Sequence, residues 1–159
     1  MTTMQTFIIL CGLVAVLYGL ITSRQILSLS PGNDKMQEIS KAIQEGARAY
    51  LNRQYKTISI VGIVIFVIII FFLGIWVGIG YFIGAFLSGA AGYVGMLVSV
   101  QANVRTAEAS RKGLSQGLSI AFKSGAVTGM LVAGLALLAI SVYYYFLLKI
   151  NVEERELIN

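Results

Sequence analysis

Four carboxylates lie in the two polar segments between the apolar stretches of the chain and could bind a divalent cation. They are Asp34, Glu38, Glu45 and Glu108. Such cations need several oxygen ligands gathered in one place, and only Asp34 and Glu38 are close enough in sequence to share one hydrated ion. The same spacing is typical of a solvated helix start, where the N-terminal dipole favours acidic groups. We expect the helix start rather than a metal site.

The remaining inventory of reactive groups is small. The chain has no histidine for general-base chemistry, and Cys11 is its single cysteine, which excludes a disulfide or a cysteine-based metal site within one chain. It has no glycine-rich phosphate loop of the P-loop type. The sequence therefore predicts no complete active site, no metal site and no cofactor site within these residues.

Composition assigns the chain to the membrane proteins. Hydrophobic residues make up 57% and charged residues 12%, and the mean hydropathy is +0.83, values far from those of a soluble domain. Charged residues are absent from 1–23, 57–104 and 124–148. A bilayer core takes about 20 helical residues, so the middle window holds two spans and the others hold one each. Because these spans contain no Asp, Glu, Lys, Arg or His, we expect that the unit does not pump ions by itself.

The predicted fold class is an all-α integral membrane protein with four transmembrane helices and a cytoplasmic amphipathic extension. We treat 1–159 as a single membrane region. Its expected parts are a helix over 5–23, a loop over 24–33, an amphipathic helix over 34–56 that runs into a helix over 57–75, an outer turn over 76–80, a helix over 81–101, a cytoplasmic loop over 102–122, a helix over 123–148 and a non-cytoplasmic tail over 149–159.

Basic residues predict the orientation. Ten of the twelve Lys and Arg residues lie in two segments, 24–56 and 105–123. Since such residues are retained on the cytoplasmic side, both segments should be cytoplasmic and both termini outside. This pattern explains the net charge of +5 without a nucleic-acid partner.

Residues 1–5 lack the basic start of a signal peptide, so we expect a retained first span.

The segment 34–56 has helical periodicity that continues into the next span. Its apolar positions recur at steps of three and four residues, and Asp34 with Gln37 could form a capping box. These positions are Met36, Ile39, Ile43, Ala47, Tyr50 or Leu51, and Ile58. We expect a cytoplasmic extension packed on its neighbours. Two alternatives stay open, namely a helix lying on the membrane surface and a ligand contact through Arg48 or Arg53.

Small residues predict two helix-packing ridges. The first contains Gly80, Gly84, Ser88 and Gly92, and the second contains Gly125, Gly129 and Ala133. Small residues at four-residue spacing let membrane helices approach closely, so replacing Gly84 or Gly92 with Leu should impair assembly but not insertion. Near the end of the first ridge, Asn103 and Arg105 should cap the cytoplasmic end of the third helix and reach toward the interface. Alternatively, they brace a loop of a part of the protein that lies outside these four helices.

Three stretches together resemble the membrane-bound ion-pumping inorganic pyrophosphatases. They are GNDKMQEISKAIQEGARAYLNRQYKTI over 32–58, AGYVGMLVSVQANVRTAEAS over 91–110 and GLSIAFKSGAVTGMLVAGLALL over 117–138. The resemblance implies a homodimeric pump with many more helices, which hydrolyses cytoplasmic pyrophosphate with magnesium, and possibly potassium, and exports protons or sodium ions. Its N-outside topology agrees with the one obtained above from basic residues alone.

The resemblance places this chain at the N-terminal portion of such a pump. It implies that these four helices belong to an outer ring, beside the pump's remaining helices and the lipid bilayer, in a membrane that we expect to be a prokaryotic cell membrane. The catalytic motifs of the family match no position here, so we expect this segment alone to be inactive. The alternative is a stand-alone four-helix protein that acts in assembly or helix–helix interaction.

Overall fold

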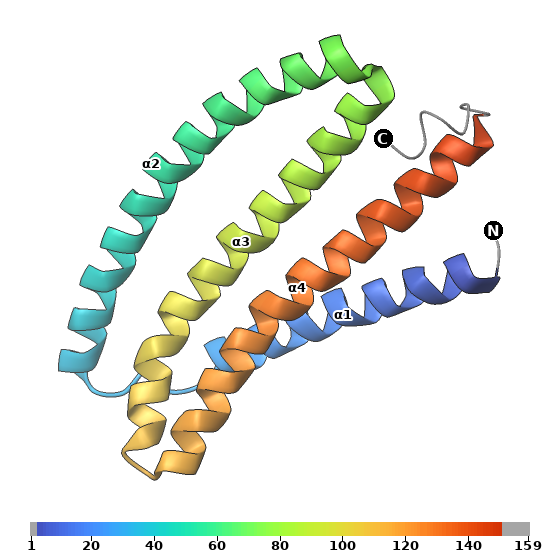
Figure 1. Ribbon diagram of the computed structural model, residues 1–159. Helices are drawn as coiled ribbons and strands as arrows, with labels where there is room; N and C mark the ends of the chain where they lie inside the picture. The colour runs from blue at the N-terminus through green and yellow to red at the C-terminus, as the bar shows by residue number, and fades with distance from the viewer. Residues whose placement is uncertain (1–2, 151–159) are drawn as a thin grey trace.

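A computed structural model describes residues 3–150 of the chain, which form four long helices. They are α1 (Thr3–Leu27), α2 (Asp34–Leu73), α3 (Ile75–Ser110) and α4 (Leu114–Lys149), as Figure 1 shows. Each is long and apolar enough to cross a membrane. The protein is therefore an all-α integral membrane protein, as its composition predicts.

The helices stand side by side in the order α2, α3, α4, α1 (Figure 1). α3 packs on α4, α4 packs on α1, and α2 packs mainly on α3. The α1–α2 connection and the α3–α4 turn lie together at one end of the bundle, whereas the α2–α3 turn lies at the other (Figure 1). We call the first end the connector end.

The turn between α2 and α3 consists of Gly74 alone, which corrects the outer turn predicted over 76–80. Gly74 has φ 96° and ψ 168°, a conformation that only glycine adopts readily. Gly78 and Gly80, which made the turn look longer, lie inside α3. They allow close contact instead, since a Cβ on Gly80 would lie 3.0 Å from Cε1 of Tyr143.

The cytoplasmic loop predicted over 102–122 is also too long. α3 continues to Ser110 and α4 begins at Leu114, so only residues 111–113 connect them. The charged residues of this segment do not end the helices, because a helix that leaves the lipid can continue in water. Lack of hydrophobicity marks the edge of the membrane and not the end of the helix.

α2 is continuous over both segments predicted for it. Its N-cap is Asn33, whose Oδ1 accepts a hydrogen bond from the backbone N of Met36 at 3.0 Å. Gln37 does not close a capping box on Asp34. Its Nε2 donates to the carbonyl oxygen of Gly32 at 3.0 Å, which also holds the connector before the helix.

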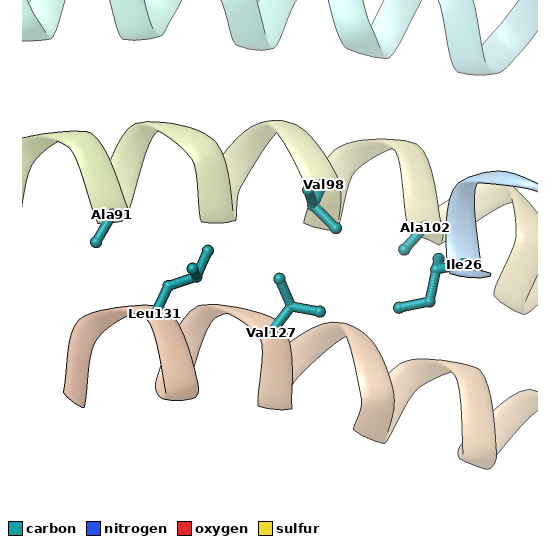
Figure 2. Packing of buried hydrophobic residues seen from close by; sticks show 6 residues of the cluster. All are labelled: Ile26, Ala91, Val98, Ala102, Val127 and Leu131. Atoms are coloured by element: carbon teal, nitrogen blue, oxygen red, sulfur yellow. The ribbon is translucent and has the colours of Figure 1, made fainter. Parts of the chain in front are cut away.

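The core is small and lies between α1, α3 and α4. Figure 2 shows its buried cluster, which contains Ile26, Ala91, Val98, Ala102, Val127 and Leu131. Most other apolar side chains are exposed, as expected where lipid covers a helix. In the most hydrophobic stretch of α2, no residue is buried inside the chain. The bundle therefore presents long apolar faces to its surroundings.

Candidate functional site: the helix-packing faces

Glycines allow close contact between α1 and α4. A Cβ on Gly134 would lie 2.8 Å from the carbonyl oxygen of Gly12, and a Cβ on Gly12 would lie 2.9 Å from Cγ of Leu138. Further along, a Cβ on Gly19 would lie 2.9 Å from Cγ of Leu131. Only glycine permits this approach, which supplies van der Waals contact where lipid offers no hydrophobic driving force.

Sequence reasoning missed this contact. The buried residues of α1 are Gly12, Ala15, Gly19, Thr22 and Ile26. They are spaced by alternating steps of three and four residues, which keeps them on one face of the helix. This spacing is the signal that would have identified α1 as a packing helix.

The first predicted ridge is divided in the structure. Gly80 lies against Tyr143 of α4, whereas Gly92 lies against Tyr55 of α2, whose hydroxyl would be 2.9 Å from an added Cβ. Gly84 and Ser88 between them are exposed, and nothing lies within 4 Å of a Cβ on Gly84. The four residues therefore do not form one face against one partner within this chain.

The second predicted ridge faces outward. Gly125, Gly129 and Ala133 are exposed on α4, and nothing lies within 4 Å of a Cβ on either glycine. The α4 face that packs inside the chain instead contains Ser124, Val127, Leu131 and Gly134. The ridge has no partner among the described residues.

Tyrosine hydroxyls connect neighbouring helices. Tyr55 of α2 donates to the carbonyl oxygen of Gly89 at 2.8 Å, and its ring meets that of Tyr93 edge-on with centroids 5.3 Å apart. Tyr143 of α4 donates to the carbonyl oxygen of Trp76. Phenol groups in a membrane span need such acceptors, so these contacts set the registers of the α2–α3 and α3–α4 pairs.

Arg105 holds the connector end together. Its Nη2 donates to the carbonyl oxygen of Leu27 at 2.7 Å, its Nε to that of Leu29 at 3.1 Å, and its Nη1 to that of Gln101 at 2.8 Å. Leu27 is the last residue of α1, so the cation satisfies carbonyls at the negative end of that helix dipole. Arg105 thus caps the end of α1 rather than the end of α3, and it also braces the α1–α2 connector within the chain.

The carboxylates do not gather into a metal centre. Within residues 3–150, no group of three His, Cys, Asp or Glu side chains could hold a metal ion. Glu38 forms an exposed salt bridge of 2.8 Å with Lys35 on α2. Glu108 forms one of 3.1 Å with Arg111. Asp34, Glu38 and Glu45 lie along one open groove on the surface of α2 itself. The described carboxylates therefore do not fit a magnesium site.

Comparison with known proteins assigns the family. Residues 13–159 match the family described as inorganic H+ pyrophosphatase. The chain belongs to this family. It is 47% identical, over 137 residues, to the K(+)-insensitive pyrophosphate-energized proton pump of Methanosarcina mazei, a match that covers 85% of this chain and 20% of that protein.

Other members of the family differ in the ion that their names give. A K(+)-insensitive pyrophosphate-energized proton pump of Caldanaerobacter subterraneus is 38% identical over 159 residues, covering 91% of this chain and 22% of that protein. A putative K(+)-stimulated pyrophosphate-energized sodium pump of Bacteroides thetaiotaomicron is 39% identical over 142 residues, covering 86% of this chain and 19% of that protein. The chain spans about a fifth of the length of these relatives.

Proposed function

We propose that this chain is the N-terminal membrane scaffold of a pump that couples hydrolysis of cytoplasmic pyrophosphate to export of protons or sodium ions. The family match over residues 13–159 carries this proposal. The three relatives named above are pyrophosphate-energized pumps, each more than four times as long as this chain. In this proposal the catalytic groups, magnesium and any potassium site belong to the remaining four-fifths.

The exposed faces of the bundle support a scaffold role. The ridge of Gly125, Gly129 and Ala133 is a surface on which another membrane helix can pack closely, and it is open in this chain. We propose that the pump's remaining helices cover it and that the whole pump is a homodimer without a nucleic-acid partner. The four helices would then be part of an outer ring.

The proposed orientation follows the basic residues. The connector end contains Arg24, Arg105, Arg111 and Lys112, so we place it in the cytoplasm of a prokaryotic cell. Both termini would lie on the other side, since α1 begins and α4 ends away from the connector end (Figure 1). A membrane-impermeant maleimide tests this, because a cysteine in place of Ser115 should react only after the cell membrane is opened.

A chimera tests the function. In it, this chain replaces the matching fifth of the Methanosarcina mazei pump, and phosphate release from magnesium pyrophosphate is measured in membranes. We expect hydrolysis by the chimera and by the unaltered pump, and none by the purified 159-residue chain. Hydrolysis by the chain alone, or an inserted chimera that is inactive beside an active parent, would overturn the proposal.

A further inference from the structure

The charged half of α2 has an apolar stripe on its surface. Ile39, Ile43 and Tyr50 are 52%, 50% and 62% exposed, and Gly46 between them has no atom within 4 Å of an added Cβ. We call these four residues the outer stripe. They are separated by steps of four, three and four residues, which places them along one face of the helix.

The chain's own packing leaves the outer stripe uncovered. Among residues 34–73, the buried residues are Ser40 and Leu51, with exposed fractions of 7% and 5%. These face α3, the main neighbour of α2, and α2 is the outermost helix of the row on that side (Figure 1). The predicted apolar face of segment 34–56 is therefore split between α3 and the surroundings.

Lipid does not account for the exposure. At about 1.5 Å per residue, α2 is about 60 Å long, roughly twice the hydrocarbon thickness of a bilayer. Its uncharged part begins at Thr57, which puts Tyr50 about 10 Å and Ile39 about 27 Å outside that part along the axis. Exposed apolar side chains in the lipid half are ordinary, but a row of them in water marks an interaction surface.

The shape of the outer stripe fits a second helix. Alternating steps of three and four residues produce the narrow seam on which two helices pack side by side. Gly46 allows the partner backbone to come close in the middle of the seam. A helix running along α2 and projecting from the same membrane would cover all four residues.

Charge distinguishes between the possible helices. The next position along the stripe is Arg53, which is exposed and has no ion pair among the described residues. Two copies of this chain in one membrane would pair their α2 helices in parallel about a two-fold axis, so Arg53 would face Arg53. This like-charge contact disfavours a second copy and favours a partner with a carboxylate at that level.

We propose that the outer stripe is the docking surface for a different helix of the same pump, which projects from the membrane beside α2 and places an acidic side chain opposite Arg53. This inference rests on the proposed function, since the partner helix belongs to the part of the pump that the chain does not contain.

Cysteine labelling in the chimera tests the docking surface. Ile43→Cys reports on the outer stripe, and Lys41→Cys on the polar side of the same turn is the matched control, both in a Cys11→Ser background. In the 159-residue chain in lipid nanodiscs, both introduced thiols should react with a soluble maleimide at similar rates. In the chimera, the Ile43→Cys rate should fall by about tenfold or more, as in a packed interface core, and the Lys41→Cys rate should not.

Each other outcome has a definite meaning. An active chimera in which the Ile43→Cys thiol reacts as fast as in the chain alone overturns the docking surface and leaves the proposed function standing. Slow labelling of the Ile43→Cys variant of the chain alone shows that lipid covers the stripe. Rapid disulfide formation between two copies of that variant shows a second copy on the stripe. Slow labelling and disulfide formation would each overturn the inference.

An inactive chimera overturns the proposed function, and the docking surface fails with it.

A charge reversal tests the acidic partner. Arg53→Glu should destabilise the chimera, measured as a lower temperature of half-inactivation, because two carboxylates would then face each other. Lys41→Glu adds the same charge away from the stripe and should leave that temperature unchanged. An equal effect of the two variants would contradict an acidic partner at Arg53.

Discussion

At the scale of single residues, the Arg105 guanidinium joins the end of α1 to α3. It donates to backbone carbonyls of Leu27, Leu29 and Gln101. The planar guanidinium holds three donors in fixed directions, so it reaches acceptors on α1, the connector and α3 at once. A lysine ammonium group lacks this fixed geometry. The stretch ANVRTA therefore has a structural task at the connector end, where both connections meet.

Replacing Arg105 should loosen this end of the bundle. Arg105→Gln removes charged hydrogen bonds worth about 1.5–3 kcal/mol each and leaves carbonyls of Leu27 and Leu29 without their donor. We expect a lower midpoint of thermal unfolding in detergent, followed by circular dichroism, and a smaller loss for Arg105→Lys.

Arg111→Gln is the control for this prediction. Its side chain is 62% exposed and pairs with Glu108 three residues earlier, so its loss should cost about 0–1 kcal/mol. If Arg105→Gln were as mild as Arg111→Gln, the capping contact would not contribute to stability.

The sequence predicts a capping role for Arg105 but assigns it to the wrong helix. In the sequence, Arg105 directly follows an uncharged apolar stretch. This position is enough to expect that its side chain makes polar contacts at the membrane–water interface. Two of its three acceptors lie 76 and 78 residues away along the chain. Only the packing of α1 against α3 brings them within reach, and no local spacing predicts it.

At the scale of helices, the spacing of small residues determines how far a ridge can extend. A step of four residues turns a helix about 40° past a full turn, so three steps from Gly80 to Gly92 rotate the face by about 120°. This is why Gly80 faces α4 while Gly92 faces α2. The three-and-four spacing of α1 has no such drift, so Gly12 and Gly19 both face α4.

Element type was easier to predict from the sequence than element ends. The uncharged windows predict four helices because hydrophobic length is a local property. The predicted limits of the outer turn were wrong because glycine has two structural roles here. Gly74 makes the turn, whereas Gly78 and Gly80 lie in a helix and allow close packing. Which of these two roles a glycine has depends on the helix that packs beside it.

Two glycines on α3 test whether only those that face a neighbouring helix contribute to packing. Gly92→Leu would push against Tyr55 and break its hydrogen bond to Gly89, so we expect a loss of about 1–3 kcal/mol in the stability of the chain. Gly84→Leu points into open space and should leave the chain's unfolding midpoint unchanged. Equal midpoints for the two variants would contradict the contact between α2 and α3.

At the scale of the whole molecule, the bundle has one packing face turned inward and others turned outward. α4 shows both on a single helix, with Gly134 against α1 and Gly129 open. A stand-alone protein has no need of a second small-residue face, whereas a scaffold within a larger pump does. The two glycines therefore separate the internal stability of the chain from its assembly with other helices.

Leucine at Gly134 should destabilise the chain itself, whereas leucine at Gly129 should impair only the chimera. Gly134→Leu forces side-chain atoms against the backbone oxygen of Gly12, which cannot move without separating α1 from α4. It should destabilise the isolated chain by about 1–3 kcal/mol or more, seen as a lower unfolding midpoint by circular dichroism. Gly129→Leu should leave that midpoint unchanged yet reduce pyrophosphate hydrolysis or monodispersity of the chimera, because the partner helix can no longer approach. An active, monodisperse Gly129→Leu chimera would show that the ridge faces lipid in the pump.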